Sequence, residues 1–117
     1  MTSKKIIPYM NVENEVAANV FTLAQRYAVN GADELFIYDY SKDDYSKEEL
    51  LHVAKALSKT IDLPFVLGLY VKRFEDVKKA LYTGASYVMM KHSLIEDYAV
   101  VKEATDRFGK DKVIIEI

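Results

Sequence analysis

The sequence predicts an α/β protein built on a parallel sheet, and three observations lead to this prediction. Short, nearly continuous apolar runs alternate with longer segments in which apolar residues recur every three to four positions. Gly, Pro or polar residues separate these segments. The 117 residues are 50% hydrophobic and 29% charged, so the chain can bury one core. We therefore expect a single α/β domain over residues 1–117.

The first half of the chain predicts two strands and two helices. Residues 6–10 form a short apolar strand, and Pro8 favours the edge of the sheet because proline cannot donate a backbone hydrogen bond. A helix follows over residues 13–29 and ends at Asn30 and Gly31. The second strand covers residues 35–38.

A capping box predicts where the second helix begins. Ser46 is followed three residues later by Glu49, which is the pattern of a reciprocal cap at a helix N-terminus. The apolar stripe of this helix comprises Leu50, Val53, Ala54 and Leu57.

The second half of the chain repeats the alternation. It predicts strands at residues 64–68, 87–90 and 113–115, and helices at residues 74–82 and 95–108. Strict alternation of strands and helices predicts right-handed crossovers and a parallel sheet.

Two Gly-Ala dipeptides suggest an internal repeat. Gly31-Ala32 and Gly84-Ala85 each follow a helix and precede a strand, 53 residues apart. They predict two copies of a βαβα unit. Gly-Ala is also a common end to a helix before a strand, and both interpretations stay open.

Four βα units and a last strand fit either half of an eight-stranded barrel or an open flavodoxin-like sheet. A complete barrel needs about 200 residues or more. Receiver proteins of the open-sheet class need carboxylates after strands 1 and 3. This chain has Asn11 and Leu69-Tyr70 at those places, which disfavours a receiver.

Composition excludes several classes of function. The net charge is -2 with no basic block, which argues against nucleic acid and membrane surfaces. There is no cysteine, and neither of the two histidines has a metal-ligand spacing, so we expect no disulfide, metal or cofactor. The apolar stretch near the N-terminus is too short for a signal peptide, and we expect a cytoplasmic protein.

The candidate functional residues are those that follow the predicted strands, because active and binding sites in parallel α/β folds lie at the carboxyl ends of the strands. Asp39, Lys91 and His92 could share one pocket. The alternative is that Asp39 caps a loop while Lys91 and His92 face solvent. His52 reads as a surface residue of the second helix.

A weaker signal for phosphate binding follows the third strand. Gly68 is the only glycine of this turn, and Lys72 and Arg73 stand at the start of the next helix. Exposed basic residues at a helix start are common, so this candidate site is weak.

Four segments of the chain resemble one family. They are residues 5–12 (KIIPYMNV), 24–39 with the passage GADELFIYD, 75–85, and 106–109 (DRFG). They are similar to the N-terminal half of the cyclase subunit of imidazole glycerol phosphate synthase, from histidine biosynthesis. The resemblance implies a (βα)4 half of a TIM barrel, followed here by a fifth parallel strand.

The departures from the family bear on activity. The family's first catalytic aspartate is Asn11 here, and an amide cannot act as a general acid or base near neutral pH. The glycine turn for substrate phosphate has become Gly68-Leu69-Tyr70, the usual Asn after strand 4 is Lys91, and the loop after strand 1 is short. The second catalytic aspartate would lie beyond Ile117. Asp39 alone matches a pocket residue of the family, so we expect no established catalytic residue, and Asp39 and His92 remain as weak candidates.

These features favour a degenerate, non-catalytic half-barrel that acts as a self-association or assembly module. We expect a homodimer or a higher homo-oligomer, with contacts from Tyr9, Met10, Val88, Met89 and Met90. The resemblance also implies a fused or partner enzyme of histidine biosynthesis, a phosphoribosyl-AMP cyclohydrolase or phosphoribosyl-ATP pyrophosphohydrolase. The alternative is a domain that binds a phosphoribosyl metabolite, or a residual enzyme, using Asp39, Lys72 and His92.

Overall fold

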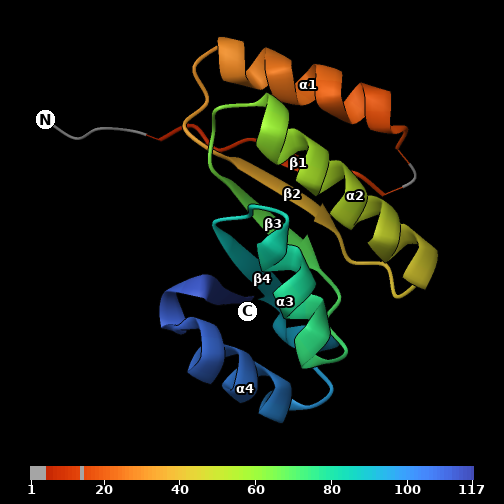
Figure 1. Ribbon diagram of the computed structural model, residues 1–117, viewed down its shortest axis with the longest axis vertical. Helices are drawn as coiled ribbons and strands as arrows, with labels where there is room; N and C mark the ends of the chain where they lie inside the picture. The colour runs from red at the N-terminus through yellow and green to blue at the C-terminus, as the bar shows by residue number, and fades with distance from the viewer. Residues whose placement is uncertain (1–4, 14) are drawn as a thin grey trace, which may run out of the picture.

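Five parallel strands form one sheet in the computed structural model, which describes residues 5–13 and 15–117 (Figure 1). The strands lie side by side in chain order: β1 (Tyr9–Asn11), β2 (Leu35–Asp39), β3 (Phe65–Leu69), β4 (Tyr87–Lys91) and β5 (Val113–Glu116). The helices between them are α1 (Ala17–Val29), α2 (Asp44–Thr60), α3 (Phe74–Tyr82) and α4 (Tyr98–Phe108). Short 3₁₀ turns, η1 (His92–Leu94) and η2 (Lys110–Lys112), flank α4.

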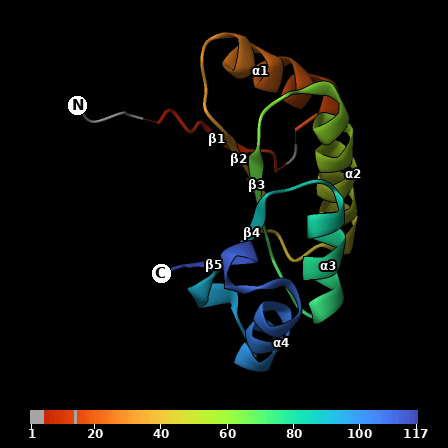
Figure 2. The same ribbon diagram turned by 60° about the vertical axis from the view of Figure 1, so that its left-hand side comes forward.

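In the part of the chain that the structure describes, the four α-helices cover the same side of the sheet, and the other side carries none (Figure 2). Because consecutive strands are neighbours, the chain never reverses its direction of travel across the sheet. An open flavodoxin-like sheet requires such a reversal. The fold is therefore half of a TIM barrel, (βα)4, with a fifth parallel strand.

The core lies between the sheet and the helices. One residue from each strand shares a row of the parallel register, and all five are at most 8% exposed: Met10, Ile37, Leu67, Val88 and Val113. Helix residues such as Leu57 and Val77 complete this core. Side chains alternate between the two faces along each strand. The burial of one set under the helices fixes which residues form the opposite face.

We call that opposite side the open face. Its strand residues are Tyr9, Asn11, Phe36, Tyr38, Val66, Gly68, Tyr87, Met89, Lys91, Ile114 and Glu116. A chain of aromatic contacts runs from β1 and along β2 on this face, with ring centroids 4.7 Å apart for Tyr9 and Phe36, 5.2 Å for Phe36 and Tyr38, and 5.7 Å for Tyr38 and Tyr40. The open face is thus lined by large aromatic side chains.

This arrangement corrects part of the expected contact set. Met10, Val88 and Met90 are buried beneath the helices, because they alternate with the residues of the open face. They are therefore not available for contacts with another chain on that face. Tyr9 and Met89 do lie on the open face.

Three helices begin elsewhere than predicted, and the first of them is α1, which starts at Ala17 rather than at residue 13. The predicted capping box of Ser46 and Glu49 at the start of α2 is wrong, because the N-cap of this helix is Asp43. Oδ2 of Asp43 accepts from the backbone N–H of Ser46 at 3.0 Å and from the Ser46 hydroxyl at 2.9 Å. The last helix starts at Tyr98 rather than at residue 95, because Asp97 caps it and η1 occupies the preceding residues.

Other expectations on the fold are confirmed. α3 has the predicted bounds, and β1 lies at the sheet edge as Pro8 predicted. Gly31 and Gly84 end α1 and α3 in equivalent places with positive φ, 94° and 108°, which glycine adopts readily. Within the described residues, no helix is both long and apolar enough to cross a membrane.

Candidate functional site

The carboxyl ends of the strands lie at one edge of the sheet, but their side chains divide between its two faces. Asp39 shares the helix-facing side with Leu35 and Ile37, whereas Lys91 is on the open face with Met89. The structure therefore does not bring Asp39, Lys91 and His92 together in one pocket, which was one of the two alternatives considered for these residues. The continuous apolar character of the strands hid this alternation in the sequence.

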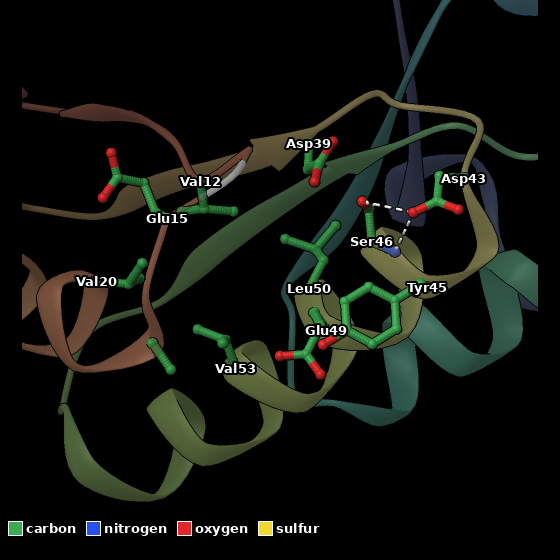
Figure 3. A pocket seen from close by; sticks show the side chains of 11 residues that line it. Val12, Glu15, Val20, Asp39, Asp43, Tyr45, Ser46, Glu49, Leu50 and Val53 are labelled. Atoms are coloured by element: carbon green, nitrogen blue, oxygen red, sulfur yellow. Dashed lines mark hydrogen bonds between the residues drawn. The ribbon is translucent and has the colours of Figure 1, made fainter.

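Asp39 is 6% exposed and holds its own loop. Its Oδ1 accepts from the backbone N–H of Ser41 at 2.9 Å and from the Ser41 hydroxyl at 2.6 Å. The carboxylate also lines a cavity of about 360 Å³ between α1 and α2, shown in Figure 3. Asp39 is thus both a loop cap and part of a pocket.

The residues after β4 face elsewhere. His92 is exposed in η1, where its Nδ1 is hydrogen-bonded to the hydroxyl of Tyr98 at the start of α4. The Lys91 Nζ lies 4.6 Å from the centroid of the Tyr40 ring, in the geometry of a cation–π contact. Burial raises the pKa of Tyr40, and the negative charge of Glu116 raises it further.

Gly68 has a packing role in this structure. A Cβ at this position would lie 2.5 Å from the Tyr40 hydroxyl oxygen and 2.8 Å from Cε1 of Phe36. The absent side chain therefore makes room for aromatic rings on the open face. These rings occupy the space through which a phosphate would approach this backbone from that face.

Lys72 and Arg73 stand at the start of α3, where a protein carboxylate already takes the place of an anion. The backbone N–H groups of both residues donate to Oδ2 of Asp76, at 2.9 and 3.2 Å. The Nζ of Lys47 lies 3.2 Å from the same oxygen. Burial alone would raise the pKa of Asp76, but the two backbone N–H groups and the Lys47 ammonium outweigh it and lower that pKa.

Tyr70 fills the region beside this ion pair. Its hydroxyl donates to Oε1 of Glu96 at 2.9 Å, and this hydrogen bond raises the pKa of Tyr70. The ammonium groups of Lys42 and Lys47 lie 5.2 and 5.3 Å from the centroid of its ring. Gly68 and Leu69 belong to β3 and not to a turn, and with Tyr70 they contribute buried packing at the end of this strand.

Sequence reasoning missed Tyr40, Lys47 and Asp76 as residues of this region. Asp76 follows Arg73 by three residues at the start of a helix, and this spacing is a recognisable cap signal. Lys47 and Tyr40 carried no local signal, because their contacts depend on the placement of neighbouring units. In the described residues, no group of three or more His, Asp or Glu side chains is placed to hold a metal ion.

Successive βα units with helices on one side and polar side chains at the carboxyl edge place the chain in the class of TIM half-barrels. The family model for histidine biosynthesis protein matches residues 5–117, so the chain belongs to that family. The family relationship inferred from the four sequence segments is confirmed.

Curated relatives support the same family membership. The HisF subunit of imidazole glycerol phosphate synthase from Tolumonas auensis is 30% identical over 129 aligned positions, which cover 100% of this chain and 50% of the relative. The corresponding subunit from Haemophilus influenzae is 28% identical, with the same coverage. The chain therefore spans about half the length of these HisF relatives.

Solved structures share the fold. A dihydropteroate synthase from Coxiella burnetii superposes with a TM-score of 0.69 at 21% identity, over 90% of this chain and 42% of that chain. The tryptophan synthase alpha chain from Legionella pneumophila gives 0.68 at 13% identity, over 97% of this chain and 50% of that chain. At these identities the likeness concerns the fold alone.

Proposed function

We propose that this chain is a non-catalytic half-barrel that self-associates through its open face. The observation that carries the proposal is the character of this face. It presents an aromatic layer without covering helices, and Tyr9 on it is 65% exposed. An apolar sheet face that stays exposed to water favours aggregation. Association with another face removes its apolar side chains from water.

A second copy of the chain is the occupant that the observations favour. The matched relatives are about twice as long, so a second half-barrel is the size of body that completes this class of fold. Lys91 and Glu116 are neighbours across β4 and β5 on the open face, and no ion pair joins them in the described residues. In a two-fold interface, each could meet the opposite charge of the other copy.

The absence of catalysis is supported by Asn11. Its side-chain oxygen accepts from the backbone N–H of Glu13 at 3.0 Å, so the amide serves a local turn. A fused or partner enzyme of histidine biosynthesis would then catalyse the reaction, and self-association of this half-barrel would bring copies of that enzyme together.

The alternative function, binding of a phosphoribosyl metabolite, has less support. Asp76 competes for the backbone N–H groups at Lys72 and Arg73, and four carboxylates surround the cavity at Asp39. Both features disfavour an anion. Calorimetric titration with inorganic phosphate and with a phosphoribosyl compound tests this alternative, and the proposal expects no binding heat from either.

Light scattering of two tyrosine variants tests self-association. We expect the wild type to have a mass of at least two chains of 13.4 kDa. Tyr9→Lys should shift the population to monomer, because it places an ammonium in the interface. Tyr82→Lys is the matched control, since Tyr82 is 70% exposed on α3, away from the open face. A monomeric wild type, or equal masses for the two variants, would overturn the proposal.

A further inference from the structure

A small cavity on the open face combines aromatic rings with two charges and a hydroxyl. Its volume is about 100 Å³, and it is lined by Tyr9, Phe36, Tyr38, Tyr40, Lys91 and Glu116. Tyr9 belongs to one edge strand of the sheet and Glu116 to the other, so the cavity lies near the middle of the face. Pockets that hold a metabolite usually have about 300–1,000 Å³. The cavity therefore has the size for a side chain and not for a metabolite.

The hydroxyl of Tyr40 needs an acceptor. Its oxygen is buried and has no hydrogen-bond partner among the described residues. Burial and the negative charge of Glu116 raise the pKa of Tyr40, so the hydroxyl keeps its proton and acts as a donor. A buried donor without an acceptor costs free energy, and native proteins rarely retain one. An acceptor brought by a binding partner would remove this cost.

Lys91 and Glu116 are the only charged side chains among the described strand residues of the open face. They are register neighbours on β4 and β5, yet within the described part of the chain no ion pair joins them and Glu116 does not accept from the Tyr40 hydroxyl. Covering this face with an apolar surface would desolvate both charges without compensation. A partner that fits the face therefore brings a negative group to Lys91 and a positive group to Glu116.

A second copy of the chain supplies this set of groups. In a two-fold dimer both copies use the same patch, so each open face presents its own Lys91 and Glu116 to the other. The axis of such a dimer passes near the middle of the patch, where the cavity lies. The Lys91 Nζ is 4.6 Å from the centroid of the Tyr40 ring, so a carboxylate that pairs with Lys91 comes close to Tyr40 as well.

We infer that Glu116 of one copy enters this cavity of the other copy, where its carboxylate pairs with Lys91 and accepts the hydrogen bond of the Tyr40 hydroxyl. The inference rests on the proposed self-association and adds the contact that selects the partner. By symmetry the contact occurs twice in each dimer. Charge complementarity at these two positions then favours another copy of this chain over an unrelated apolar surface.

Two charge reversals test the contact by light scattering. Lys91→Glu and Glu116→Lys should each weaken dimerisation at least about tenfold, because like charges then meet in the interface. An equimolar mixture should regain dimers that contain one copy of each variant, which native mass spectrometry detects when one variant is ¹⁵N-labelled. Lys59→Glu, at an exposed position in the last turn of α2, is the control and should dimerise like the wild type. A monomeric wild type would overturn the self-association itself. A dimeric wild type with equally dimeric variants, or with no mixed dimers, would overturn this inference alone.

Tyr40→Phe tests the hydrogen bond separately from the ion pair. It keeps the ring beneath Lys91 and removes only the hydroxyl. The dissociation constant of the dimer should rise about tenfold or more, as expected for a hydrogen bond to a charged acceptor. Urea denaturation of the dissociated chain should show no loss of stability, because there the hydroxyl has no partner to lose. A dimer as tight as the wild type, or a less stable single chain, would contradict the assigned role of the hydroxyl.

Discussion

Gly68 shows how one residue determines which side chains pack on the open face. The rings of Tyr40 and Phe36 occupy the space of a side chain at this position. We predict that Gly68→Ala lowers the free energy of unfolding by about 1–3 kcal/mol through overpacking. Urea denaturation measures this change.

A double-mutant cycle identifies the cause. Tyr40→Leu shortens the side chain that the new methyl group meets, so Gly68→Ala should cost less in that background than in the wild type. An equal cost in both backgrounds would mean that contact with Tyr40 is not the reason for the glycine.

Asp76 illustrates a structural charge at the start of a helix. It is paired with Lys47, and the side chains are 12% and 9% exposed. Asp76→Asn should lower the free energy of unfolding by about 3 kcal/mol at neutral pH, because it leaves the Lys47 ammonium buried without a counter-charge. Asp106→Asn, which breaks the exposed pair with Lys102, should change stability little.

The pH dependence gives an independent check on Asp76. A carboxyl whose pKa is lowered by folding stabilises the protein above its unfolded value, near 3.8, and loses this contribution as the pH falls through the folded pKa. The stability difference between wild type and Asp76→Asn should therefore shrink below pH 3.8. A difference that stays constant down to the acid transition would exclude an ionic role.

The sequence predicted the positions of the candidate site residues along the chain but not the faces of the sheet on which their side chains lie. Asp39 could be placed at the end of a strand, and its role in a loop was one of the two alternatives considered. The separation of Asp39 from Lys91 depends on which face each side chain takes, and strands that are apolar on both faces do not reveal it. The contact of Gly68 with Tyr40 depends on packing between neighbouring strands.

At the scale of elements, the periodicities predicted every helix and strand, while local hydrogen bonds decided the boundaries. α1 starts at Ala17 and not at residue 13, because Asn11 and Val12 hold a turn there. Asp43 caps α2 although Ser46 has the more familiar motif. Several polar residues near a helix start can serve as the cap, and the sequence does not rank them.

β5 makes a testable contribution to stability. Its Val113 is buried opposite Val88 of β4. Burial of an aliphatic side chain of this kind contributes about 1.5–3 kcal/mol. Deletion of residues 111–117 should therefore lower the melting temperature or change the oligomeric state.

Removal of Ile117 alone is the control for this deletion, because that residue is fully exposed and lies outside β5. It should leave the melting temperature unchanged. If the longer deletion preserved both the melting curve and the mass in solution, β5 would have no structural role.

At the scale of the whole molecule, the fold separates two surfaces. The helix-covered side contains the core and the acidic cavity at Asp39. The open face contains the aromatic layer and the neighbouring charges of Lys91 and Glu116. In this parallel (βα)4 sheet the helices cover one face, and the other face is the one that the proposed self-association would bury.

Hydroxyl-radical footprinting of the wild-type chain measures whether the open face is buried between two copies. The measurement compares oxidation of Tyr9 with that of Tyr82 at nanomolar and at high micromolar protein concentration. Both side chains are exposed in the single chain, at 65% and 70%. If the open face is buried between two copies, Tyr9 becomes protected at the higher concentration while Tyr82 does not. Equal oxidation of Tyr9 at both concentrations, at a protein mass of one chain, would contradict this burial.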